Sequence, residues 1–420
     1  MPAAFTSPLA ETVAADLLDR FTRYVQIDTQ SRVDRERSPS TPGQLDLSRM
    51  LVEELHAIGL ADAALDEHGY VYASLPGTVP DTPVIGLIAH VDTSPDAPGA
   101  GVKPLVHRDY DGGVIELPLC GTRLDPATMP ELESKRGHDI VTSSGDTLLG
   151  ADDKAGVAAI VSAVAHLAAH PELPRPTLRI AFTPDEETGQ GASRFDIPRF
   201  GARCAYTMDG SKLGELQDES FSAVEVRVKV EGLGVHPGFA TGKLVSALRL
   251  VAQIVAALPV DRLTPETTSE REGFIHPTLL RGSTDAAEAR WIVRDFDESQ
   301  LESHVQLLRE TTEQVAAANP RAKVEFDVIR QYRNMHEYIK HDPDVVAAAV
   351  EALVAEGIEP IRNPIRGGTD GSLLSEMGLP TPNIFDGGHE YHSVREWASL
   401  QEMAAAAAVI VRLAETWTRR

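Results

Sequence analysis

The sequence predicts an α/β protein in which a mixed, mostly parallel sheet is flanked by helices and a smaller α/β domain is inserted. Two kinds of pattern support this class. Short continuous apolar runs, of which 84–89 (VIGLIA) is the clearest, are typical of strands that are covered on both faces. The segment 221–230 (FSAVEVRVKV) instead alternates apolar and charged residues, as expected of a strand with one exposed face.

The first part of the chain alternates helical and strand-like segments. Ser7 and Pro8 fit the N-cap and first residue of a helix, and a second helix is expected from about Leu47 to Gly59. Three strands and an Ala-rich helix follow, expected at 84–89, 178–182, 205–208 and 156–169 respectively. Polar residues collect after these strands, and ligands bind at strand ends in open α/β sheets.

A change of pattern near Glu219 marks the start of the inserted domain. After the alternating strand, the further elements are expected at 244–258, 274–280, 288–296, 299–318 and 323–329. Their βαββαβ order predicts a ferredoxin-like unit with both helices on one face. We therefore assign 1–218 and 340–420 to one domain and 219–339 to the insertion. A helix at 400–417 is expected to pack back on the first sheet.

Composition narrows the possible functions. A chain of 420 residues is longer than one hydrophobic core usually organises, so two domains are expected. The chain has 39 Lys plus Arg and 63 Asp plus Glu, and its net charge of −24 disfavours nucleic acid and anionic membranes as partners. Cys120 and Cys204 are too few for a disulfide framework. The N-terminal stretch lacks a signal-peptide pattern, and no window approaches the roughly 20 apolar residues of a membrane span, so we expect a cytoplasmic location.

Several histidines and acids follow predicted strands. His90 and Asp92 are two residues apart, so on a strand both would point to one side, and the carboxylate could orient a metal-bound imidazole. Taken alone, a solvated pair is the simpler interpretation of this spacing. Asp152 and Asp153 precede a helix, where acids also complement the helix dipole.

The DEETG segment places Asp185, Glu186 and Glu187 directly after an apolar strand. Adjacent carboxylates repel one another unless a cation compensates, although a solvated acidic loop is equally compatible with the pattern. Asp209 ends another apolar strand, and His392 lies among glycines and aromatics. Together, two histidines and at least three carboxylates at strand ends provide enough ligands for two zinc ions that share one carboxylate.

A set of motifs carries a family resemblance. The segments are IAHVDTSPD, TLLGADDKAG, FTPDEETGQGA, YTMDG, VHPG, RDFD, PIRGGTDG and EYHSVREW, with YVQIDTQS near the N-terminus. In their order and intervals they resemble the M20 metallopeptidases, and among them the tripeptide aminopeptidases, over nearly the whole chain. The resemblance implies a zinc-peptidase-like catalytic domain and an inserted domain that serves as a lid and in dimerisation.

The resemblance also implies a division of labour among the site residues. One zinc ion would be held by His90, Asp152 and Asp209, and the other by Asp152, Glu187 and His392, with Asp152 as the bridge. The peptide bond after the bridging aspartate is typically cis in the family.

Two catalytic residues follow from the same resemblance. Asp92 would support His90, and Glu186 would take a proton from the attacking water and return it to the leaving amine.

The resemblance further suggests two substrate-binding residues. His236 would stabilise the oxyanion, sometimes from the partner subunit of a dimer, although a turn histidine is the plainer interpretation of its motif. Arg366 would receive the substrate's terminal carboxylate. His389 and Glu390 depart from the family, which has an aromatic residue and an amide there, so they would alter the pocket or offer His389 as a competing ligand.

The sequence therefore predicts an aminopeptidase that removes the N-terminal residue from tripeptides with two zinc ions per subunit. A homodimer through the lid domain is compatible with the family. The alternatives are another M20 hydrolase, either a dipeptidase or an amino-acid deacylase, and a non-enzymatic binding protein on a decayed scaffold. The presence of Glu186, Asp92 and all the expected ligands argues against decay.

Overall fold

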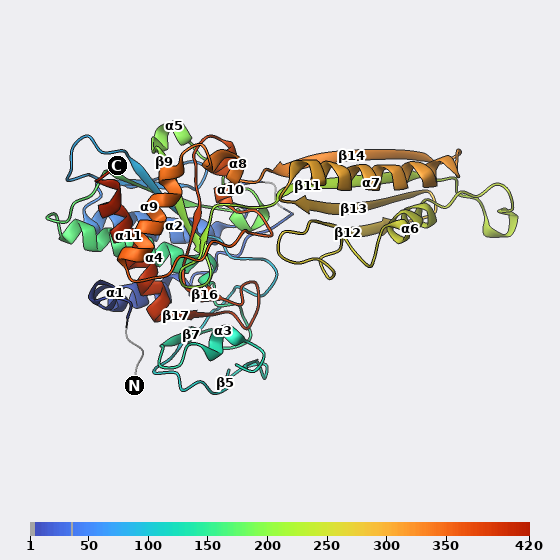
Figure 1. Cartoon of the computed structure of the whole chain (residues 1–420). Coiled ribbons are helices and arrows are strands. Elements are labelled where there is room, and N and C mark those ends of the chain that lie inside the picture. The colour runs from blue at the N-terminus through green and yellow to red at the C-terminus, as the bar shows by residue number, and fades with distance from the viewer. Residues whose placement is uncertain (1–4, 35–36) are drawn as a thin grey trace. The chain divides into compact units, whose positions relative to one another are not determined.

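The computed structural model describes residues 5–34 and 37–420, and the chain divides into two compact units (Figure 1). The first unit comprises Met1–Asp218, Tyr338–Asn363 and Thr369–Arg420, and the second comprises Glu219–Glu337 and Pro364–Gly368. The short segment Pro364–Gly368 thus belongs to the second unit, although the predicted boundaries place it in the first. The reason is a long-range pairing, because Ile365 forms a parallel bridge with Ser220, which lies in the second unit.

A mixed seven-stranded sheet runs through the first unit. In sheet order its strands are β1 (Ala64–Leu65), β2 (Val71–Leu75), β8 (Leu178–Thr183), β3 (Ile85–His90), β9 (Cys204–Gly210), β15 (Asn383–Phe385) and β10 (Leu216–Gln217). The four central strands from β8 to β15 are parallel, and the outer strands pair antiparallel. The predicted α/β class with a mixed sheet flanked by helices is confirmed.

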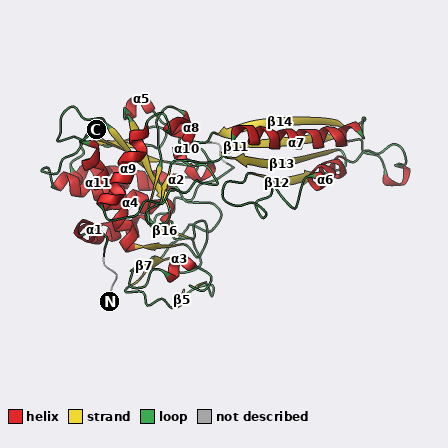
Figure 2. Ribbon diagram, viewed as in Figure 1, coloured by secondary structure: helices red, strands yellow, loops and turns green. Residues whose placement is uncertain are grey.

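Helices cover both faces of this sheet (Figure 2). The large core contains residues of α1 (Pro8–Tyr24), α2 (Pro42–Ile58), α4 (Ala151–Ala169), α9 (Pro343–Ala355) and α11 (Leu400–Trp417). Successive side chains of a strand point to opposite faces, so Leu87 joins this core while Ile88 joins a second core with residues of α5 (Ile197–Phe200) and α10 (Asp370–Glu376). The continuous apolar run around Leu87 therefore reflects burial on both faces.

The helix ends show where local sequence signals were sufficient to predict the first and last residues of a helix. Ser7 caps α1, its Oγ accepting the N–H of Ala10 at 3.1 Å, and α11 has the predicted bounds. Helix α2 begins at Pro42, earlier than predicted, because proline suits the first helical position. Helix α4 also begins earlier than predicted, at Ala151, and its first turn is irregular.

A smaller antiparallel sheet completes the first unit and was not predicted. Its strands are β16 (Gly388–His389), β17 (Trp397–Ser399), β7 (Ile140–Thr142) and β4 (Leu105–His107). A hairpin of β5 (Ile115–Glu116) and β6 (Arg123–Leu124) lies beside α3 (Pro130–Glu133) in sequence, and a further short helix, α8, spans His336–Ile339. Strands of two or three residues carry too little periodicity to be recognised in a sequence.

The second unit has the βαββαβ order that was predicted. Its elements are β11 (Ser222–Glu231), α6 (Ala247–Ala257), β12 (Phe274–Gly282), β13 (Ala286–Asp295), α7 (Glu298–Ala317) and β14 (Lys323–Tyr332). The strands form an antiparallel sheet in the order β12-β13-β11-β14. Apolar residues of both helices and of the sheet face that they cover form one core, which includes the fully buried Trp291. Within residues 5–34 and 37–420, no helix is long and apolar enough to cross a membrane.

Candidate metal centre

The ends of three adjacent parallel strands supply most of the predicted site. His90 is the last residue of β3, Asp209 lies near the end of β9, and the short 3₁₀ helix Glu186–Thr188 follows β8. Asp152 lies in the first turn of α4, and His392 lies in the loop between β16 and β17. The five predicted ligands come together, and we call them the ligand cluster: His90, Asp152, Glu187, Asp209 and His392.

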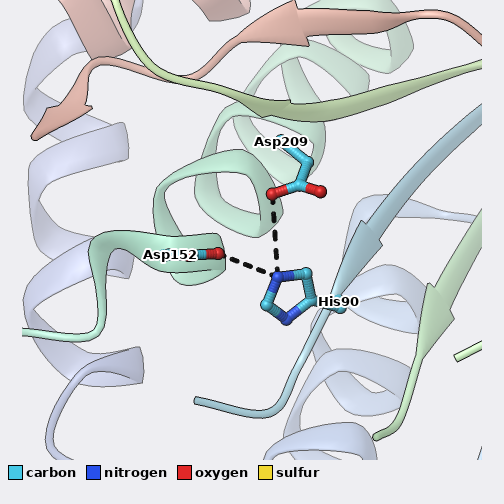
Figure 3. A group of neighbouring side chains, drawn as sticks. All are labelled: His90, Asp152 and Asp209. Atoms are coloured by element: carbon cyan, nitrogen blue, oxygen red, sulfur yellow. Dashed lines mark hydrogen bonds and ion pairs between the residues drawn. The ribbon is translucent and has the colours of Figure 1, made fainter. Parts of the chain in front are cut away.

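The ligand cluster has two halves that share Asp152, and the first half comprises His90, Asp152 and Asp209 (Figure 3). The Nε2 of His90 lies 2.9 Å from Oδ1 of Asp152 and 3.7 Å from Oδ1 of Asp209. The imidazole of His90 is buried, and the two carboxylates approach the same ring nitrogen from different elements. One nitrogen and two oxygens converging in this way form a suitable ligand set for a divalent cation.

The other half of the ligand cluster surrounds His392. Its Nε2 lies 2.9 Å from Oε2 of Glu187 and 3.2 Å from Oδ2 of Asp152. Asp152 therefore directs one carboxylate oxygen towards His90 and the other towards His392. In each half, the ligand atoms all lie within 4.8 Å of one another. This is the arrangement expected of a carboxylate that bridges two cations.

The charges of the ligand cluster also fit bound cations. Burial and the neighbouring Asp152 raise the pKa of Glu187 to about 8. Contacts with Asp152 and Glu187 raise the pKa of His392 to about 11. Within the described residues, the buried Oε1 of Glu187 has no hydrogen-bond partner. An unsatisfied buried carboxylate oxygen and acids crowded around two imidazoles are the features that metal ions would compensate.

Asp92 forms hydrogen bonds with the backbone of the DEETG segment, which the sequence analysis did not predict. The Nδ1 of His90 donates a hydrogen bond to the main-chain carbonyl of Asp92 at 3.1 Å, and Oδ1 of the carboxylate lies slightly farther away, at 3.5 Å. The two carboxylate oxygens of Asp92 accept the main-chain N–H groups of Glu186 and Glu187, at 2.9 and 3.2 Å. Asp92 thus positions the backbone of both glutamates as well as lying beside His90.

Asp185 is the first residue of the DEETG segment, and its fully buried side chain ties this segment to residues 38–44. Its carboxylate accepts hydrogen bonds from Ser38 Oγ, from the N–H of Ser40 and from Gln44 Nε2, each at 2.9 Å. The sequence analysis placed Asp185 among three adjacent acids but did not identify these partners. They lie far away in the sequence and form no motif with it.

Two further acids next to the ligand cluster were not predicted. Oδ2 of Asp96 lies 3.4 Å from Nδ1 of His392, on the ring edge opposite the ligand atoms. Asp153 accepts the main-chain N–H of His90 at 3.0 Å. The peptide bond between Asp152 and Asp153 is cis, as the family resemblance implied.

With this geometry established, comparisons with known proteins identify the family. A family model described as Peptidase family M20/M25/M40 matches residues 149–416. Peptidase T of Bacillus subtilis is 44% identical over 402 residues, covering 95% of this chain and 98% of the relative. Peptidase T of Vibrio parahaemolyticus is 44% identical over 405 residues, covering 96% and 99%. The chain belongs to the M20 peptidase family. The prediction of an enzyme of the metallo-aminopeptidase class is confirmed.

Solved structures share the fold of this M20 peptidase. Aminopeptidase PepT from Bacillus cereus aligns with a TM-score of 0.75 and 24% identity, covering 96% of this chain and 98% of that one. A tripeptidase from Staphylococcus aureus aligns with a TM-score of 0.77 and 20% identity, covering 97% and 99%. An M20 peptidase from Bacillus subtilis, described as dinuclear and metal-binding, aligns with a TM-score of 0.66 and 16% identity, covering 96% and 98%.

The two predicted substrate-binding residues of the M20 peptidase lie in the second unit. His236 is exposed, and its Nδ1 accepts the N–H of Gly238 at 3.1 Å. Arg366 donates through Nη1 to the carbonyl oxygens of Glu270 and Glu272, both at 2.8 Å, and through Nη2 to Thr268 Oγ1 at 3.0 Å. The contacts of Arg366 fix the loop around Glu270. The roles of His236 and Arg366 towards the substrate stay predictions.

His389 and Glu390, which depart from the family pattern beside His392, lie in different environments. His389 is buried, stacks on Trp397 with ring centroids 4.0 Å apart, and has its Nε2 2.7 Å from Oε2 of Glu402. This nitrogen is therefore engaged by Glu402, and the imidazole of His389 is not part of the ligand cluster. Glu390 is exposed, and its Oε2 lies 3.7 Å from Nη2 of Arg395.

Proposed function

We propose that this M20 peptidase is a tripeptide aminopeptidase that works with two zinc ions. The observation that carries the proposal is the placement of Asp152, whose two carboxylate oxygens face two different histidines at 2.9 and 3.2 Å. The relatives called peptidase T, at 44% identity over nearly the whole chain, support the activity. The solved structure called a tripeptidase is consistent with it.

The ligand cluster would hold one cation between His90, Asp152 and Asp209 and the other between Asp152, Glu187 and His392. We propose zinc because imidazole and carboxylate ligands at two closely spaced positions suit this ion. Bound there, two zinc ions would polarise the scissile carbonyl and lower the pKa of a bound water.

Glu186 is the residue proposed to move the proton. Its main-chain N–H is fixed by Asp92, and its half-buried side chain interacts electrostatically with Asp209 and Asp370. Burial and these neighbouring acids raise the pKa of Glu186 well above its ordinary value. A carboxylate that holds a proton more firmly than usual is suited to take one from the attacking water and deliver it to the leaving amine. Glu187 cannot share this role, because its Oε2 faces His392.

His236 and Arg366, both in the second unit, are proposed to bind the substrate. His236 would stabilise the oxyanion and Arg366 would bind the terminal carboxylate of the peptide. We also propose a homodimer formed through this unit. The cytoplasmic location and the absence of a nucleic-acid partner rest on composition and remain proposals.

Substrate assays distinguish this activity from that of other M20 hydrolases. The purified zinc-loaded protein is given a free tripeptide, the corresponding dipeptide and the N-acetylated tripeptide, and the products are identified by mass spectrometry. We expect release of the N-terminal residue from the free tripeptide and little reaction with the other two. Preferred cleavage of the dipeptide or release of the acyl group from the blocked peptide would show a dipeptidase or a deacylase instead.

A further inference from the structure

We infer that Glu396 is a positioning residue of the metal centre, which fixes the backbone of the bridging ligand Asp152 relative to His392. The inference deepens the proposed function and rests on it. Glu396 lies just before β17, within the EYHSVREW motif, but the sequence analysis gave this residue no role. Its side chain is almost completely buried, with 1% of the residue exposed.

The carboxylate of Glu396 is occupied by the loop that leads into α4. Its Oε2 accepts the main-chain N–H groups of Leu149 and Gly150, both at 2.7 Å. Its Oε1 accepts the N–H of Asp152 at 3.1 Å. Both oxygens thus accept main-chain N–H groups, and Glu396 is not a member of the ligand cluster, although it lies only four residues after His392 in the chain.

The loop needs such an acceptor because its backbone is not helical. Gly150 has a φ of 84°, and Asp152 has φ and ψ of −80° and 103°. The first N–H groups of a helix have no partner four residues earlier, and a carboxylate at this end satisfies them and complements the helix dipole. Glu396 therefore acts as a cap from a distant part of the chain, in place of a local N-cap side chain.

Glu396 shares its loop with a ligand. The loop connects β16 to β17, which pair in a fixed register with Gly388 opposite Ala398, and it contains both His392 and Glu396. The N–H of Glu396 donates to the carbonyl of Ser393 at 3.2 Å, which closes a turn directly after His392. One loop thus presents the imidazole that faces Oδ2 of Asp152 and, four residues later, the carboxylate that holds the N–H of Asp152.

Removal of the charge of Glu396 tests this role. In Glu396→Gln, the amide oxygen can still accept from Leu149 and Gly150, but the NH₂ group then faces the N–H of Asp152 and cannot accept it. We expect zinc binding, measured by competition with a chromogenic chelator, to weaken by about 10- to 100-fold, the range found when groups that orient metal ligands are removed. This readout does not depend on turnover.

The matched control is Glu390→Gln, which removes the same charge from the same loop at an exposed position next to Arg395. It should bind zinc as the wild type does. If Glu396→Gln fails to fold, Glu396→Asp keeps the charge but shortens the reach, and we expect its zinc affinity to fall as well.

The outcomes separate the inference from the proposed function. Wild-type zinc affinity in a folded Glu396→Gln or Glu396→Asp protein would overturn the positioning role and leave the proposed metal centre intact. Equal weakening in Glu390→Gln would also overturn it, because a general charge effect would then explain the loss. A wild-type chain that binds no metal would overturn the proposed function and this inference with it.

Discussion

Glu186 and Glu187 are neighbours in the chain, yet their carboxylates have different surroundings. Asp92 accepts both of their N–H groups, so the backbone of the pair is held as one piece. Oε2 of Glu187 lies 2.9 Å from Nε2 of His392, whereas the Glu186 carboxylate interacts electrostatically with Asp209 and Asp370. These different surroundings fit the proposed roles, in which Glu187 binds a metal and Glu186 exchanges a proton.

Alanine substitutions should separate these roles. Glu186→Ala should keep both metals and lose roughly 10²- to 10⁴-fold in kcat, the usual contribution of a general base. Glu187→Ala should lose one metal of the two, because a ligand is removed. Metal analysis together with kinetics on both variants checks this, and near-normal turnover by Glu186→Ala would show that the base lies elsewhere.

Substitution of Asp92 tests its hold on the backbone. Asp92→Asn can accept one of the two N–H groups but places an NH₂ group opposite the other, so the positions of Glu186 and Glu187 should relax. We expect metal affinity or kcat/KM to fall by about 10- to 100-fold, as is typical of residues that orient metal ligands. Unchanged values for both quantities would contradict the role assigned to Asp92.

The sequence was sufficient to predict which residues form the ligand cluster, but it was not sufficient to predict which residues support them. His90, Asp209 and Glu187 follow apolar strands, and this placement can be recognised in a single sequence. Asp96 and Glu396 lie within the IAHVDTSPD and EYHSVREW motifs, but their roles could not be predicted there, because their partners are an imidazole far along the chain and main-chain N–H groups. Hydrogen bonds to main-chain atoms leave no trace in the identity of the partner residue.

At the scale of elements, the site is built from loops that are fixed on several sides. The DEETG loop is tied to Asp92 on one side and, through Asp185, to the segment from Ser38 to Gln44 on the other. The loop before α4 is tied to Glu396. Loops that carry ligands are thereby given the rigidity that the adjacent strands have from their sheet.

The contact between Asp185 and Ser40 should be measurable as stability. Ser40→Ala removes the hydroxyl that donates to the buried Asp185, which accepts both the N–H and the Oγ of Ser40. Because an acceptor in a buried site loses a partner, the free energy of unfolding should fall by about 1–3 kcal/mol in urea denaturation. Ser134→Ala is the control, since Ser134 is an exposed serine of the same unit, and its change should stay within about 0.5 kcal/mol. Equal effects in both variants would contradict the role of the Ser40 contact.

Element types were predicted better than element ends. The C-terminal helix was predicted with its observed bounds, because Ser399 caps it and its apolar periodicity is long. The start of α4 was missed because Asp152 and Asp153 have non-helical dihedral angles that depend on distant contacts. The sheet from β16 to β4 was missed because its strands are too short to show a period.

At the scale of the whole molecule, the ligand cluster lies in the first unit alone. The βαββαβ order of the second unit could be predicted from alternating apolar and charged residues. The assignment of Pro364–Gly368 to this unit could not, because it depends on a bridge between Ile365 and Ser220 that joins distant parts of the chain.

Metal removal should therefore affect the two units differently. Metal that binds only the folded first unit stabilises it by mass action, by about 2.7 kcal/mol at a free concentration 100 times the Kd. Hydrogen exchange with mass spectrometry should show chelation-dependent loss of protection around Asp152 and His392 and little change in β11 to β14. Equal loss in both units would contradict a metal centre that stabilises the first unit alone.

The central claim is that Asp152 bridges two zinc ions, and anomalous diffraction at the zinc edge from crystals of the zinc-loaded protein tests it most directly. We predict two peaks about 3.5–4 Å apart. One peak should lie among His90, Asp152 and Asp209 and the other among Asp152, Glu187 and His392. A single peak, or two peaks of which only one contacts Asp152, would contradict the claim.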